Sequence, residues 1–75
     1  MSLNDVKLNT DCVIKSVDIE DEKTKIRLME LGLIEGAIVK VSRRSVLKKT
    51  LLIIFNSSCF TLKDNLAREI VVKYA

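Results

Sequence analysis

The chain has 75 residues, of which 48% are hydrophobic, and its formal net charge is +3. A chain of this length forms one domain at most, so we expect residues 1–75 to be a single domain. It contains no histidine, tryptophan or proline, which excludes serine–histidine–aspartate and cysteine–histidine nucleophiles and zinc sites that use histidine. The composition therefore favours a small binding module over an enzyme.

The sequence shows neither a secretory leader nor a membrane span. Its longest apolar run, residues 51–55, is far shorter than the roughly 20 residues that a bilayer-spanning helix needs. The two cysteines, Cys12 and Cys59, are too few for a disulfide framework. These features predict a cytoplasmic protein.

The first predicted element is a strand over residues 12–19. Its apolar positions change phase between Ile14 and Val17, which indicates a β-bulge near Lys15 and Ser16. Small barrels use such bulges to bend a strand.

A helix is predicted over residues 22–31, with Asp21 as its N-cap. Leu28 and Leu31 are three residues apart, so we expect both to face the core. Gly32 follows directly, at the position where helices commonly end in the left-handed conformation.

The segment after the helix is predicted to turn back. Leu33 and Ile34 are expected to fold onto the helix, and Leu33 to join the core. Glu35 and Gly36 then form the centre of a predicted type II turn, in which Gly36 takes the positive φ.

Four further strands are expected in the rest of the chain, over residues 37–43, 51–55, 59–63 and 69–73. On the third and fourth strands, the apolar residues expected to face one another are Leu51, Ile53 and Phe55 on one side and Phe60 and Leu62 on the other. Together the elements predict a small, mainly β, five-stranded barrel with one short helix.

Two of the connections are also predicted. Residues 43–49 are expected to form a basic loop. Residues 64–68 are expected to form a short turn or a single helical turn, with Asp64 as its cap.

At residues 27–36, RLMELGLIEG, the sequence resembles the signature of FeoA-domain proteins, in which a helix ends R-L-x-x-L-G before an apolar residue and a turn that ends in glycine. The following strand matches the family through Val39 and Val41. The closing pattern A-x-x-I-x-V also matches, through Ala67, Ile70 and Val72. The resemblance extends over nearly the whole chain in the right order and spacing.

The resemblance implies an SH3-like barrel with the helix inserted between the first two strands. It implies a cytoplasmic accessory protein of bacterial ferrous iron uptake, which binds the FeoB membrane transporter at its GTPase region and so lies at the inner face of the membrane through that partner. Members act by protein–protein contact rather than catalysis. The same domain occurs at the C-terminus of iron-dependent repressors and is described as transition-metal-associated, so a module of metal-dependent regulation is the second hypothesis.

Leu52 and Ile54 are the first candidates for a partner contact. On an alternating strand they point away from Leu51 and Ile53, and a thin barrel has only one core. Exposed adjacent apolar residues indicate an interface, either with a partner or with a second copy of the chain. The alternative is that residues 3–8 cover them.

Charged residues are the second group of candidates. Arg43, Arg44, Lys48 and Lys49 are available for an acidic partner face, anionic lipid or RNA, or they form a solvated loop. Small barrels do bind RNA, but stacking needs exposed aromatic residues, and Phe55 and Phe60 are expected to be buried. No helix-turn-helix pattern for DNA binding is present. On the helix and turn, the residues expected to be exposed for recognition are Arg27, Glu30 and Glu35.

Metal ligands are few in this sequence. Cys12 and Cys59 lack the close paired spacing of metal knuckles. The acidic residues 18–22 occur where a helix start favours carboxylates in any case. The sequence therefore predicts no specific metal site and no cofactor.

Overall fold

Eight short elements make up the chain, in a computed structural model that describes residues 1–75. In chain order they are a 3-10 helix η1 (Leu3–Asp5), β1 (Asp11–Val17), α1 (Glu22–Glu30), β2 (Ile38–Ser45), β3 (Thr50–Phe55), β4 (Ser58–Lys63), α2 (Asp64–Ala67) and β5 (Ile70–Tyr74). All predicted strands and the predicted helix are present, and no end differs from its prediction by more than two residues.

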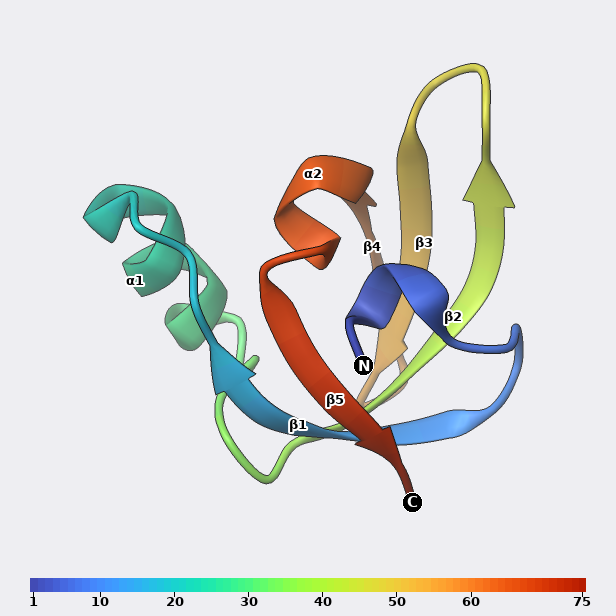
Figure 1. Cartoon of the computed structure of the whole chain (residues 1–75). Helices are drawn as coiled ribbons and strands as arrows, with labels where there is room; N and C mark the ends of the chain where they lie inside the picture. Colours follow the sequence, from blue (N-terminus) through green and yellow to red (C-terminus); the bar gives the residue numbers. More distant parts are fainter.

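The five strands form one antiparallel sheet in the order β4-β3-β2-β1-β5. The sheet curls so that β5 and the β2–β3 hairpin lie on different sides of the chain's N-terminal segment (Figure 1). Helix α1 connects β1 to β2 and stands to one side of the sheet (Figure 1). The predicted mainly β fold, with a helix between the first two strands, is therefore confirmed.

Two register shifts bend this sheet. The first lies between Ile14 and Ser16 of β1, opposite β5, and confirms the bulge that the phase change predicted. The second lies between Val41 and Arg43 of β2, opposite β3, and was not predicted. A bulge in each of two neighbouring strands increases the local twist that curls a small sheet.

Strand β2 is longer than the sequence indicated, so the prediction of a basic loop over residues 43–49 is wrong at its start. Arg43 and Arg44 belong to the strand and pair with Leu52 and Leu51 of β3. A strand is stabilised by its backbone hydrogen bonds, and a charged side chain does not interrupt them. The connection between β2 and β3 is therefore only residues 46–49.

The core is entirely hydrophobic. Its strand residues alternate with exposed ones, and the predicted facing of β3 and β4 is confirmed by the pairs Leu51 with Leu62 and Ile53 with Phe60. The fifteen buried residues are Leu3, Val6, Cys12, Ile14, Ile19, Leu28, Leu33, Val39, Val41, Leu51, Ile53, Leu62, Ala67, Ile70 and Val72.

The N-terminal segment belongs to this core. Leu3 and Val6 are buried, and η1 packs against α2 and β5. The Val72 N–H donates to the Met1 carbonyl over 2.8 Å. The segment therefore does not serve as the cover that was considered for Leu52 and Ile54, and 37% of Ile54 stays exposed.

Helix α1 has the predicted caps at both ends. The Asp21 carboxylate accepts from the Thr24 N–H over 3.2 Å. At the other end the Leu33 N–H donates to the Leu28 carbonyl and the Gly32 N–H to the Met29 carbonyl, with Gly32 at φ 98°. This is a Schellman motif, and it brings Leu33 back against Leu28.

The same motif explains why the predicted core position of Leu31 is wrong. Leu31 is the C-cap residue and is 49% exposed, because the turn after it directs Leu33, not Leu31, towards the core. Ile34, which was expected to fold onto the helix, lines a groove together with Met29 of α1 but stays exposed. Beyond it, the Ala37 N–H donates to the Ile34 carbonyl across Glu35 and Gly36, and Gly36 has φ 91°, so the predicted turn is confirmed.

The predicted cap of α2 is also wrong. The helix begins at Asp64, so Lys63 is the cap residue, and no side chain caps this end. The Asp64 N–H donates to the Lys49 carbonyl over 2.9 Å, and its carboxylate pairs with Arg68 at 3.6 Å. Asp64 therefore connects α2 to the loop that precedes β3.

Substitution of Gly32 by alanine is expected to destabilise the fold by about 2 kcal/mol or more, because the new side chain adds left-handed strain and overpacking. An added Cβ would lie 2.6 Å from Cε2 of the Phe55 ring. Gly36→Ala is the matched control, since its φ is also positive but no atom lies within 4 Å of the added Cβ. Urea denaturation of both variants measures the difference, and equal losses would contradict a packing role for Gly32.

Candidate functional site

An apolar row crosses the outer face of the sheet. Residues directly opposite one another in an antiparallel pair share a face. Val13 pairs with Ile38, and Ile54 pairs with Lys40, two residues further along the strand from Ile38. Leu52 is two residues before Ile54 on β3, so all four apolar side chains point away from the core. We call Val13, Ile38, Leu52 and Ile54 the outer-face row.

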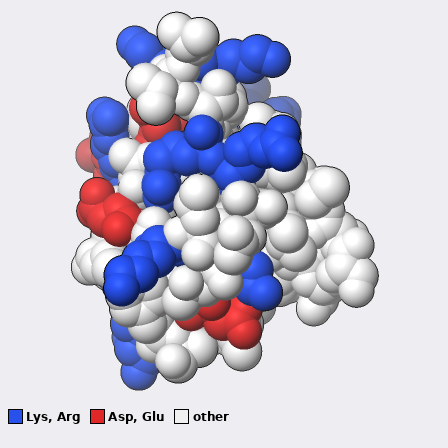
Figure 2. Space-filling model, turned by 90° about the vertical axis from the view of Figure 1, so that its right-hand side faces the viewer, with Lys and Arg blue, Asp and Glu red and all other residues white.

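The row is accessible to a partner. Ile38 is 53% exposed and Ile54 37%, whereas Val13 and Leu52 are half-buried. Figure 2 shows an area without Lys, Arg, Asp or Glu along the right-hand side of the molecule. The strand pairing joins the two sequence candidates Leu52 and Ile54 with Val13 and Ile38 in one apolar row.

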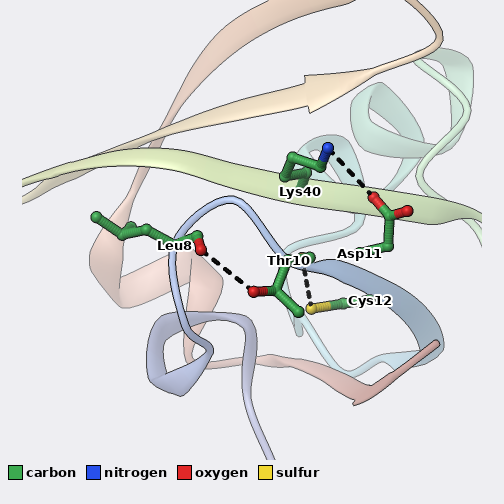
Figure 3. A network of polar contacts seen from close by, with 5 residues as sticks. All are labelled: Leu8, Thr10, Asp11, Cys12 and Lys40. Carbon is green, nitrogen blue, oxygen red and sulfur yellow. Dashed lines mark hydrogen bonds and ion pairs between the residues drawn. The ribbon is translucent and has the colours of Figure 1, made fainter.

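Charged residues border this row along β1 and β2. Lys40 Nζ lies 3.6 Å from Asp11 Oδ1 across the two strands, and both side chains are solvated (Figure 3). Arg43 lines a shallow groove together with Leu52 and Thr61. A solvated ion pair adds little stability, so Lys40 and Asp11 can exchange partners at small cost.

Ile38 extends the row towards the end of α1. Together with Ile34 and the Phe55 ring it lines a shallow groove that passes over Gly32 and Gly36. Ile34 and Ile38 were not among the residues predicted to contact a partner. The exposure of Ile38 could have been predicted from the alternation along β2, because Val39 and Val41 are buried and Ile38 must then point outwards.

The other predicted recognition residues do not join the row. Arg27 and Glu30 are exposed on α1 and line a separate groove with Lys23 and Ile26. Glu35 is exposed in the turn, where it borders the Ile34 groove. Gly32 and Gly36 adopt the positive φ angles that the two turns described above require.

The four predicted basic residues divide into two groups. Lys48 and Lys49 are exposed in the loop between β2 and β3, and Arg43 is exposed on β2. Arg44 points the other way, and its Nη2 donates to the Val6 carbonyl over 2.9 Å. Arg44 therefore holds the N-terminal segment against β2 and is not part of the exposed cluster.

The two cysteines lie on opposite faces of the sheet. Cys12 is buried and its Sγ donates to the Thr10 carbonyl over 3.4 Å (Figure 3). Burial raises the pKa of the Cys12 thiol, and the charge of Asp11 raises it further. Cys59 is exposed beside Ile54 on the outer face.

No group of three or more His, Cys, Asp or Glu side chains is placed to hold a metal ion. None of the helices has the length and apolar character that a membrane-spanning helix requires.

The family model of the FeoA domain matches residues 1–74. The chain belongs to the FeoA domain family. This match confirms the predicted membership. Members of the family are small accessory proteins of ferrous iron transport. No curated protein sequence matches the chain significantly.

Solved structures of family members share this fold. The FeoA protein of Chlorobium tepidum is 32% identical with a TM-score of 0.89, over 99% of this chain and 70% of that one. The FeoA of Stenotrophomonas maltophilia, an SH3 domain protein complexed with zinc, is 29% identical with a TM-score of 0.83, over 97% and 89%. These neighbours confirm the predicted SH3-like fold.

The fold also occurs within a longer protein. ScaR with bound Zn²⁺ is 16% identical to this chain, with a TM-score of 0.84 over 100% of this chain and 37% of ScaR. At this identity the likeness concerns the fold alone.

The two thiols are expected to differ strongly in reactivity. A thiol reacts with Ellman's reagent as the thiolate and only where the reagent can reach it. Cys59 is exposed and should therefore react in the folded protein, whereas Cys12 is buried and should not. Both should react in urea. Reaction of both thiols at one rate in the folded state would contradict the placement of Cys12 in the core.

Stability is expected to fall as the pH rises above 9.0, the ordinary pKa of the Cys12 thiol. The unfolded chain loses this proton near that pH, whereas the folded chain, whose pKa is raised, still holds it, so deprotonation favours the unfolded state. The difference in unfolding free energy between the natural chain and a Cys12→Val variant, measured at pH values on both sides of 9.0, isolates this group. A difference that does not change with pH would contradict the effect.

Proposed function

We propose that this chain is a cytoplasmic accessory protein of ferrous iron uptake that acts by binding the GTPase region of a FeoB-like membrane transporter. The match of the FeoA domain to residues 1–74 carries this proposal. The chain contributes a binding surface, with residues 1–75 acting as one domain. No step of the proposal requires a reacting group on this protein.

The outer-face row is the surface proposed for that contact. Backbone pairing within the sheet holds the main chain of Ile38 and Ile54 in place, so little backbone ordering is required on binding. Their removal from water favours association, and Lys40 at the border suits an acidic rim on the partner. Glu35, beside the connected groove, adds the opposite charge at one end.

The effect on the transporter follows from differential affinity. A bound protein shifts its partner between two states only if it binds one of them more tightly. A surface without catalytic groups can therefore change GTP hydrolysis in either direction, and turnover measured with and without this chain gives the sign. A second copy of the chain is the alternative occupant of the row, and sedimentation equilibrium of the isolated protein distinguishes it.

Replacement of Ile38 by serine is expected to weaken binding to the purified GTPase domain about tenfold or more, because one buried aliphatic side chain contributes about 1.5–3 kcal/mol. Ile26→Ser is the matched control: Ile26 is 50% exposed against 53% for Ile38, but lies on α1 outside the row. Titration calorimetry with both variants and with Leu52→Ser/Ile54→Ser makes the comparison.

Two results would count against the proposal. If the natural chain does not bind the GTPase domain, the partner is wrong. If Ile26→Ser and Ile38→Ser weaken binding equally, the partner is right but the surface is wrong. Circular dichroism of each variant confirms that the fold is retained.

A further inference from the structure

Two apolar side chains at the tip of the β2–β3 hairpin are almost fully exposed. Val46 is 84% and Leu47 97% exposed, the highest values among the large hydrophobic residues of the chain. The hairpin projects from the sheet, so that its tip lies far from the core (Figure 1). An aliphatic side chain in this position gains free energy when it enters an apolar phase.

Five cations surround the base of this tip. Lys48 lines two adjoining grooves, one shared with Lys49, Lys63 and Arg68, the other with Arg43. Asp64 is the one carboxylate in these grooves, and it is paired with Arg68 at 3.6 Å. In Figure 2, uncharged atoms at the upper end of the molecule are flanked by Lys and Arg.

The loop that carries the tip is held from both sides. The Ser45 hydroxyl accepts from the Lys48 N–H over 3.3 Å, and the Lys49 carbonyl accepts from the Asp64 N–H over 2.9 Å. Lys49 has φ 54°, which turns the chain back into β3. These contacts restrain the backbone of the tip, so little backbone ordering is required on binding.

We propose that the hairpin tip binds an anionic lipid surface, with Val46 and Leu47 inserted and the five cations at the level of the headgroups. A bilayer is complementary to both features, because it offers an apolar interior behind a negatively charged surface. A nucleic acid offers phosphates for the cations but no apolar phase for aliphatic side chains, and the loop has no aromatic residue for stacking on bases. The combination therefore favours a membrane over RNA.

The proposal goes beyond the transporter contact and is tested separately. The tip residues are different from those substituted in the outer-face row. Lipid vesicles contain no protein, so a failure to bind them does not bear on the GTPase contact.

Flotation with lipid vesicles is the test. The natural chain is expected to float with vesicles of phosphatidylcholine and phosphatidylglycerol and not with phosphatidylcholine alone, and added salt is expected to weaken binding. Val46→Ser/Leu47→Ser is expected to lower partitioning about tenfold or more. Lys48→Gln/Lys49→Gln is expected to lower it roughly fivefold for each charge removed.

Matched controls lie on α1. Ile26→Ser removes an exposed aliphatic side chain, and Lys23→Gln/Lys25→Gln removes two positive charges, so both variants are expected to bind vesicles like the natural chain. The proposal is overturned if the natural chain does not bind anionic vesicles, or if Val46→Ser/Leu47→Ser binds them as well as the natural chain does. It is also overturned if the α1 variants lose as much binding as the tip variants. Binding of polyuridylate without binding of vesicles would assign the cations to RNA instead.

Discussion

Only one face of this five-stranded sheet is buried, and that constraint decides where the molecule can bind a partner. All fifteen buried residues are hydrophobic, and the strand residues among them alternate with outward-facing ones. An apolar residue on an outward position therefore adds nothing to the core. The backbone of Ile38 and Ile54 is nevertheless fixed, because both residues lie in the paired strands β2 and β3. The sheet thus holds the Cα positions of this apolar surface in place without any packing of its side chains.

Gly32 links this surface to α1. Its positive φ permits the turn that returns Leu33 to Leu28, and its missing side chain leaves room for the Phe55 ring at the end of β3. The helix is therefore fixed at its C-terminal end, while most of its length stands beside the sheet (Figure 1). The groove lined by Ile34, Ile38 and Phe55 passes over this junction. The turn at Gly32 therefore lies next to the end of the outer-face row at Ile38.

Features of the fold that depend on local chemistry could be predicted from sequence. The bulge in β1 follows from the phase of Ile14 and Val17, and the caps of α1 follow from Asp21 and Gly32. Predictions failed where a sequence pattern was continued beyond the end of the element it belongs to. The helical spacing of Leu28 and Leu31 predicted that both face the core, but Leu31 is already the C-cap residue of α1. The charges of Arg43 and Arg44 indicated a loop, although pairing with β3 continues through both.

The candidate surfaces were predictable only in part, because they depend on register between strands. Leu52 and Ile54 could be selected from one strand alone, but their continuity with Val13 and Ile38 requires the pairing of three strands. The same pairing of β2 with β3 places the outer-face row on the sides of these strands and the apolar tip at the end of their hairpin. A chain held at a membrane by the tip would present the row to a neighbour in that membrane. Two weak contacts then act together, since the first raises the effective concentration for the second.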